Sequence, residues 1–239
     1  FYWQQRNGDE ELAALGAVTT FASLSAAHDF LCAQGREDLR ISGLNAFDPH
    51  QGNLFLPRLE WRRLGGKATL RLVIHSATSL LDDAVAARAF LQSLNSEQAT
   101  AASMPSLRSE QHAPEYPQWR ELIMQATQAI GAGEMDKVVL ARVTDLRFSA
   151  PLQAFAIMAA SRRSNLNCFH FLMAFSPQQA FLGSTPERLW RRRGALLRTE
   201  ALAGTVANHH DDARAQQLAD WLMKDDKNQR ENMLVVEDI

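Results

Sequence analysis

The sequence contains only two cysteines, Cys32 and Cys168, among its 239 residues. They lie far apart and stand in no CxxC or Cys/His spacing, so the sequence does not favour a disulfide framework. Two isolated cysteines are typical of free thiols in a reducing compartment, and we therefore expect a cytoplasmic protein. No apolar run approaches the ~18 to 20 residues of a membrane span, and we expect no membrane partner.

An excess of charge of one sign is also lacking. Lys and Arg together number 25 against 27 Asp and Glu, which gives a net charge of -2. This balance offers no electrostatic attraction for nucleic acid or an anionic membrane, so we expect small-molecule partners and no nucleic acid. The sequence further lacks a P-loop, a GxGxxG motif and a nucleophile elbow.

The hydrophobic content of 46% is high enough for a sizeable core, and the length allows one large domain or two small ones. In 67–75, Leu70, Leu72 and Ile74 alternate with other residues, which predicts a strand that buries this face. Strand-like and helix-like segments occur in blocks without steady βαβα alternation. We therefore predict an α+β fold, with largely antiparallel sheets and flanking helices.

A polar stretch divides the chain. Residues 96–114 are rich in Ser, Ala, Glu, Gln and Pro, a composition that predicts an exposed connection. We interpret 1–239 as the N-terminal and central part of a single domain, with a candidate subdomain boundary near 96–114.

Lys137 stands near the start of the sequence GEMDKVVLARVTDLRF, residues 133–148. The apolar residues that follow it are predicted to form a strand buried on both faces, so that the lysine would face an interior or a cleft. In the simpler interpretation, its stem covers apolar surface while its ammonium reaches water or a carboxylate such as Glu134 or Asp136. In the functional one, desolvation lowers its pKa from ~10.4 until it acts as a base. The pattern alone favours the simpler interpretation.

Glu187 lies in the sequence GSTPERL, whose Gly, Ser and Pro residues predict a tight turn between strands. Pro186 fixes the backbone directly before the carboxylate, and a turn at a strand end is a suitable platform for a catalytic group. The alternative is an exposed loop glutamate paired with Arg188 or Arg191, worth at most ~1 kcal/mol.

Two further candidates follow towards the C-terminus. In Ala203, Gly204 and Thr205, the glycine would let backbone N–H groups approach an anionic ligand, although three such residues can equally form an ordinary turn. Glu231 shares a helix face with Leu234, and it could turn a carboxylate towards a hard cation such as Mg²⁺. One carboxylate alone does not define a metal site.

Four motifs, KVVLAR, GSTPERL, TEALAGT and DDKNQRENMLVVEDI, resemble the chorismate-utilising enzymes in their order and separation. Within that family the sequence is most similar to the isochorismate synthases of the menaquinone pathway. FYWQQRNG and GLNAFDP near the start extend the resemblance over nearly the whole chain. The resemblance implies antiparallel sheets that enclose a chorismate pocket, and Mg²⁺ as the cofactor.

The same resemblance implies a role for each candidate residue. Lys137 would be the general base that activates water for attack at C2 of chorismate, and Glu187 the general acid that protonates the departing C4 hydroxyl. Glu231 would bind Mg²⁺. Ala203, Gly204 and Thr205 would contact the substrate.

The sequence departs from the family pattern at some positions. Thr185 changes the family's SPE motif to STPE, which should leave Glu187 in place. Asn208 stands where many ammonia-using relatives carry an arginine, which favours water as the nucleophile and implies no amidotransferase subunit. The alternatives are an anthranilate or aminodeoxychorismate synthase component, a salicylate synthase that also eliminates pyruvate, and a non-catalytic chorismate-binding module. The presence of Lys137, Glu187 and Glu231 together argues against the last of these.

The sequence stops at Ile239 inside an apolar-periodic segment without a helix-ending Gly, Asn or Pro. The family's C-terminal segment, with a glycine-rich strand and a further Mg²⁺-binding glutamate, has no counterpart in it. We therefore expect a fragment that binds Mg²⁺ poorly and has little or no turnover by itself.

Overall fold

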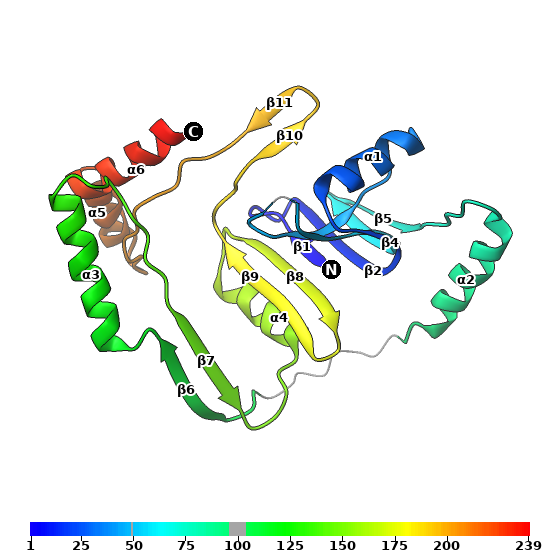
Figure 1. Ribbon diagram of the computed structural model, residues 1–239, viewed down its shortest axis with the longest axis horizontal. Coiled ribbons are helices and arrows are strands. Elements are labelled where there is room, and N and C mark those ends of the chain that lie inside the picture. Colours follow the sequence, from blue (N-terminus) through cyan, green and yellow to red (C-terminus); the bar gives the residue numbers. More distant parts are fainter. Residues whose placement is uncertain (49, 96–103) are drawn as a thin grey trace. The chain divides into compact units, whose positions relative to one another are not determined.

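The computed structural model describes residues 1–48, 50–95 and 104–239. The chain forms two compact units, coloured by sequence in Figure 1. The first unit contains Phe1–Pro105 and Pro151–Pro186, and the second contains Ser106–Ala150 and Glu187–Ile239.

The chain passes from one unit to the other three times. The first crossing, between Pro105 and Ser106, falls within the predicted connection 96–114, of which residues 96–103 lie outside the described residues. The other two crossings follow Ala150 and Pro186 and have no counterpart in the sequence-based prediction. Each unit is therefore built from two separate stretches of sequence.

The first unit is built on a seven-stranded antiparallel sheet in the order β3-β4-β2-β1-β8-β9, with β5 also paired to β4. The long strand β4 pairs with β3 along its first half and with β5 along its second half. Gly65, with a φ of 57°, closes the β4–β5 hairpin at the predicted turn. The strands are β1 (Tyr2–Gln4), β2 (Glu10–Phe21), β3 (Ser42–Asn45), β4 (Gly52–Leu64), β5 (Lys67–Leu72), β8 (Phe169–Ser176) and β9 (Gln179–Thr185).

In the described part of this unit there are three helices: α1 (Leu24–Gln34), α2 (Leu80–Ser93) and α4 (Ala154–Ser164). The hydroxyl of Ser23 caps α1 by accepting a hydrogen bond from the backbone N–H of Ala26. Helix α4 packs against β8 and β9, as Figure 1 shows. Helix α2 is attached to the sheet by the ion pair between Arg58 and Asp83, at 2.6 Å.

The core of this unit contains Leu12, Ala14 and Phe55, against which Phe1 and Met173 pack. Because β1 joins β2 to β8, residues from both sequence stretches contribute to this core. Burial of this apolar surface is the main stabilising contribution to the unit.

The face of 67–75 predicted to be buried is instead exposed. Leu70 is 68% exposed, and Leu72 and Ile74 are also exposed, whereas Val73 is buried. The reason is the position of the strand: among the described strands β5 pairs only with β4, at the margin of the sheet. The alternation correctly predicted a strand but not which of its faces is covered.

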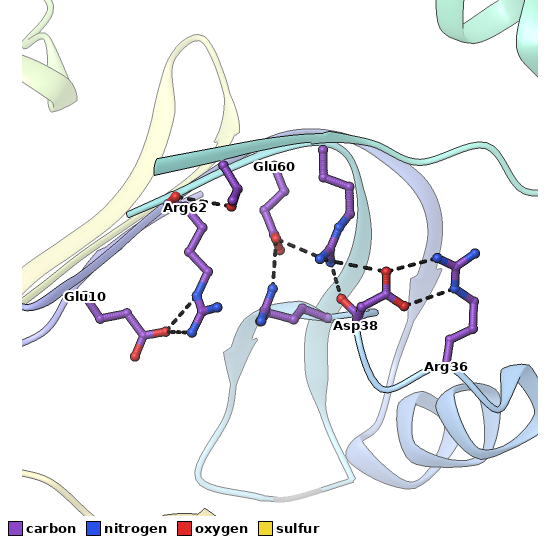
Figure 2. Close-up of polar contacts among 8 residues, drawn as sticks. Glu10, Arg36, Asp38, Glu60 and Arg62 are labelled. Carbon is purple, nitrogen blue, oxygen red and sulfur yellow. Dashed lines mark hydrogen bonds and ion pairs between the residues drawn. The ribbon is translucent and has the colours of Figure 1, made fainter. Parts of the chain in front are cut away.

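Paired charges lie along β4, as Figure 2 shows. Glu60 is only 4% exposed, and its Oε1 lies 3.2 Å from Nη1 of Arg40 and 3.6 Å from Nη1 of Arg71. Arg71 also contacts Asp38, which pairs with Arg36. A buried carboxylate is costly unless cations compensate it, so this network secures the segment before β3 to the sheet.

The second unit contains two separate two-stranded antiparallel sheets, β6–β7 and β10–β11, and three helices. Gly194, with a φ of 58°, makes the predicted turn of the β10–β11 hairpin. The elements are β6 (Leu107–Ala113), β7 (Val143–Phe148), β10 (Arg191–Arg193), β11 (Leu196–Arg198), α3 (Tyr116–Gly131), α5 (Asp212–Leu222) and α6 (Asp226–Asp238).

Strand β6 lies inside 96–114, where an exposed connection was predicted. Its residues are polar, LRSEQHA, but they pair with β7, for example His112 with Thr144. Pairing between segments distant in sequence has therefore overridden the local composition.

The prediction of a strand that begins near Lys137 is also wrong, because the observed strand starts later. Strand β7 begins only at Val143, and residues 137–142 pair with no other strand in the described part of the chain. Val138 is 41% and Val139 78% exposed, so the expected burial on both faces is absent among the described residues. A strand forms only where a neighbour receives its backbone hydrogen bonds, and none of the described strands does so here.

The predicted α+β class with antiparallel sheets and flanking helices is confirmed. None of the helices in the described ranges is long and apolar enough to cross a bilayer.

Candidate active site

A cavity of about 720 Å³ in the second unit is lined by residues 136–140 and by helices α3 and α6. Trp119, Ile123 and Ile130 of α3 form an apolar wall, because helical spacing places them on one face. Helix α6 contributes Lys227 and Glu231. The cavity therefore combines an apolar wall with charged side chains.

Lys137 and Glu231 meet at this cavity, with 3.9 Å between Nζ of the lysine and Oε1 of the glutamate. Each side chain is 30% exposed. The other carboxylate oxygen of Glu231 accepts a hydrogen bond from Nζ of Lys227 at 3.0 Å. The structure thus brings together two residues that sequence reasoning had proposed separately, and it adds a second lysine.

The hydrogen bond from Lys227 lowers the pKa of Glu231 below its ordinary value. The positive charges of Lys227 and Lys137 act in the same direction, while partial desolvation opposes them. Glu231 is therefore held as a carboxylate, the form that binds cations.

Glu231 fits the role of one Mg²⁺ ligand but does not by itself make a metal site. No group of three or more His, Cys, Asp or Glu side chains suited to a metal occurs among the described residues. Mg²⁺ is usually held by one or two carboxylates, with water and substrate oxygens completing its octahedron. The Nζ atoms of Lys137 and Lys227 lie beside its two oxygens, so the surroundings of this carboxylate accommodate positive charge.

The segment 201–208 has no regular secondary structure and lies against α6. Gly204 has a φ of 81°, a left-handed conformation that favours glycine. The carbonyl oxygen of Ala201 accepts a hydrogen bond from Nδ2 of Asn232 at 3.3 Å. Ala203 and Gly204 are half-buried, whereas Thr205 is exposed. The predicted substrate segment and Glu231 are thus attached to the same helix.

Glu187 follows the end of β9, one residue after Pro186, and its side chain is exposed. The strand end is fixed in the first unit, because the Pro186 carbonyl accepts a hydrogen bond from Nη1 of Arg6 at 2.8 Å. Ser184 lies 2.7 Å from both Nδ1 of His170 and Oγ of Ser161. The predicted tight turn between strands is wrong: Gly183 and Ser184 lie within β9, and Glu187 belongs to the irregular segment that follows Pro186.

Sequence reasoning found one residue of α6 and missed three of its neighbours, Lys227, Asn228 and Asn232. The signal for Lys227 was available, because it precedes Glu231 by four residues, the spacing of helical ion pairs. Asn228 and Asn232 gave no such signal, since the segment that they contact, around Ala201 and Gly204, is irregular.

A family model described as "Chorismate binding enzyme" matches residues 40–239. Isochorismate synthase MenF of Escherichia coli (strain K12) is 63% identical over 240 residues, which cover 100% of this chain and 56% of that protein. Isochorismate synthase MenF of Pasteurella multocida is 35% identical, with 100% of this chain and 54% of that protein covered. The chain therefore spans about half the length of these relatives.

The fold is shared with solved structures. The structure of MenF, the menaquinone-specific isochorismate synthase from Escherichia coli, superimposes with a TM-score of 0.93 at 63% identity, covering 99% of this chain and 56% of that one. DhbC from Bacillus anthracis gives a TM-score of 0.67 at 16% identity, covering 99% and 57%, and bears on the fold alone. The chain belongs to the family of chorismate-binding enzymes.

Proposed function

We propose that this protein is an isochorismate synthase of the menaquinone pathway, which converts chorismate to isochorismate in the cytoplasm. The observation that carries the proposal is that Lys137 and Glu231, far apart in the sequence, line one cavity. The 63% identity to a protein named isochorismate synthase supports the choice of reaction.

The reaction requires one base and one acid. Lys137 takes a proton from water as the water oxygen bonds to C2 of chorismate. The ring double bonds shift and the C4–O bond breaks, while Glu187 donates a proton so that the leaving group departs as water. One water enters and one leaves, so the product is an isomer. Both groups are needed, because water is a poor nucleophile without a base and hydroxide a poor leaving group without an acid.

The remaining residues bind and orient the substrate. When bound, Mg²⁺ supplies positive charge that neutralises and orients the substrate carboxylate. Glu231 would hold the ion, and Lys227 keeps this carboxylate ionised through its hydrogen bond. Backbone groups of Ala203, Gly204 and Thr205 would contact the substrate carboxylate, so that the ring is fixed between base and acid.

We expect the 239 residues alone to show weak Mg²⁺ binding and little turnover. Val138 and Val139, which follow Lys137 and line the cavity, are exposed, so the described residues alone do not enclose this part of it. The expectation is tested by comparing this chain with a polypeptide of the length of its relatives under the same conditions. Robust isochorismate formation by the 239 residues would refute it.

The decisive experiment is to incubate the full-length protein with chorismate and Mg²⁺, with and without ammonium, and to identify the products by chromatography. We expect isochorismate in both cases, without an amidotransferase subunit. An aromatic amine that appears only with ammonium would indicate an anthranilate or aminodeoxychorismate synthase component. Salicylate and pyruvate would indicate a salicylate synthase, and binding without conversion a non-catalytic module.

The acid and base assignments are tested by Lys137→Ala and Glu187→Gln in the same assay. Both should abolish isochorismate formation with an unchanged circular dichroism spectrum. Lys224→Ala and Glu237→Gln are matched controls, because they remove the same charges from exposed positions in the second unit. If Lys137→Ala and Glu187→Gln both kept full activity, the assignment would be wrong.

A further inference from the structure

The irregular segment Ala201–Thr205 has no strand or helix of its own to hold it in place. A backbone that binds a ligand must nevertheless keep its N–H groups in a fixed direction before the ligand arrives. The contacts that can order this segment are therefore those it makes with helix α6.

Asn232 makes the first contact. Its side-chain amide donates to the carbonyl oxygen of Ala201 at 3.3 Å, in a half-buried position. It directly follows Glu231, so the residue that binds the segment and the carboxylate at the cavity are neighbours on the helix.

Asn228 makes the second contact, one helical turn earlier. A Cβ atom added to Gly204 would lie only 2.9 Å from Oδ1 of Asn228 and 3.3 Å from its Cβ and Cγ. The chain therefore approaches the helix more closely at Gly204 than a larger residue would permit. Asn228 fills the space against which Gly204 packs.

The orientation of Asn228 is itself fixed. Its Nδ2 donates to Oδ2 of Asp225 at 2.7 Å, and the same oxygen accepts the backbone N–H of Asn228 at 3.0 Å. Asp225 caps the N-terminus of α6 in this way. With its amide nitrogen held by Asp225, Asn228 must turn its carbonyl oxygen towards Gly204.

From these contacts we infer that Asn228 and Asn232 are positioning residues, which hold Ala201–Thr205 on the helix that carries Glu231. The inference rests on the proposed function, in which this segment contacts the substrate carboxylate. In this role the two asparagines act through the segment rather than on the substrate itself. Their effect is to fix the segment relative to Glu231, so that one rigid helix aligns two parts of the substrate site.

The test compares Asn232→Ala with Gln229→Ala in the full-length protein. The control is matched, because Gln229 lies on the same helix and its amide also donates to a backbone carbonyl, that of Met223 at 2.9 Å. For Asn232→Ala we expect KM for chorismate to rise about three- to tenfold, the loss of one hydrogen bond, with kcat changed less than twofold. Gln229→Ala should leave KM unchanged, and Asn232→Gln, which keeps the donor, should recover part of the loss.

Hydrogen exchange separates this inference from the proposed function. Amides of 201–205 should exchange faster in Asn232→Ala than in Gln229→Ala, whether or not the protein is active. If the wild type forms isochorismate and Asn232→Ala changes neither KM nor exchange, the inference is wrong and the proposed function stands. If the wild type forms none, the proposed function fails, and exchange alone decides whether Asn232 holds the segment.

Discussion

Replacing Asp83 by Asn should destabilise the first unit in a pH-dependent way. Asp83 accepts hydrogen bonds from Arg58 at 2.6 and 2.7 Å and from the backbone N–H of His75 at 2.8 Å. The bonds from Arg58 are the main cause that lowers the pKa of Asp83 from 3.8 to about 2. Arg58 and Asp83 are only 11% and 15% exposed, so solvent screens the pair weakly.

The size of the effect follows from the pKa shift. A difference between 3.8 and about 2 corresponds to about 2.4 kcal/mol of unfolding free energy at neutral pH. Because the folded-state pKa is the lower one, this stabilisation is fully present above pH 3.8 and is lost as the pH falls through about 2. About half of it, ~1.3 kcal/mol, should remain at pH 3.

The measurement is urea unfolding of wild type and Asp83→Asn at pH 7 and pH 3, followed by circular dichroism. Hydrogen exchange of the α2 amides would show whether the loss is local to this helix. Asp82→Asn is the control: it removes an exposed charge from the same first turn and should cost only ~0.5 kcal/mol, a helix-dipole effect. Equal losses in the two variants, or a loss at pH 3 as large as at pH 7, would refute the reasoning.

Three further variants test other parts of the structure. Gly204→Ala should lower the thermal midpoint of the second unit and raise KM for chorismate more than the control Gly133→Ala does. Both glycines have a positive φ, but of the two only Gly204 has a neighbour within 3 Å of an added Cβ. Equal effects of the two variants would contradict the close packing of Gly204 on Asn228. Glu231→Gln should weaken Mg²⁺ binding by tenfold or more in calorimetry of the full-length protein, and unchanged affinity would remove Glu231 from the metal site. Gly183→Ala should destabilise the β8–β9 pair by about 1 to 3 kcal/mol in urea unfolding, because the Cβ of the new alanine would lie 2.6 Å from the ring of Phe171. An unchanged unfolding midpoint would mean that the ring moves away without cost.

Local signals predicted much of the fold. Gly65 with Gly66, and Gly194, marked the two hairpin turns, because only a few residue types accept a positive φ at a tight turn. Both turns are present. The sequence predicted these hairpins because strand, turn and partner strand all lie within a few residues of one another.

Pairing between distant segments was not predictable in the same way. The polar β6 pairs with β7 across the whole of α3, and no property of its own residues indicates a strand. The apolar run after Lys137 gives the opposite case, since its residues favour a strand but none of the described strands pairs with it. In both cases the deciding factor is the presence of a partner, which composition does not report.

In the candidate site, too, local sequence signals were predictable and contacts between distant segments were not. Motif order selected the candidate residues, but it could not predict that helix α6 would contact both Lys137 and the segment around Gly204. On this helix Glu231 faces the cavity and Lys137, while the adjacent Asn232 and the preceding Asn228 face the segment around Gly204. Successive residues of a helix are separated by about 100°, so neighbouring positions can serve different partners. A change in the direction of α6 would therefore move the carboxylate and the segment together, whereas a change at Asn228 or Asn232 would move the segment alone. For this reason the two asparagines should affect KM for chorismate, and Glu231 the affinity for Mg²⁺.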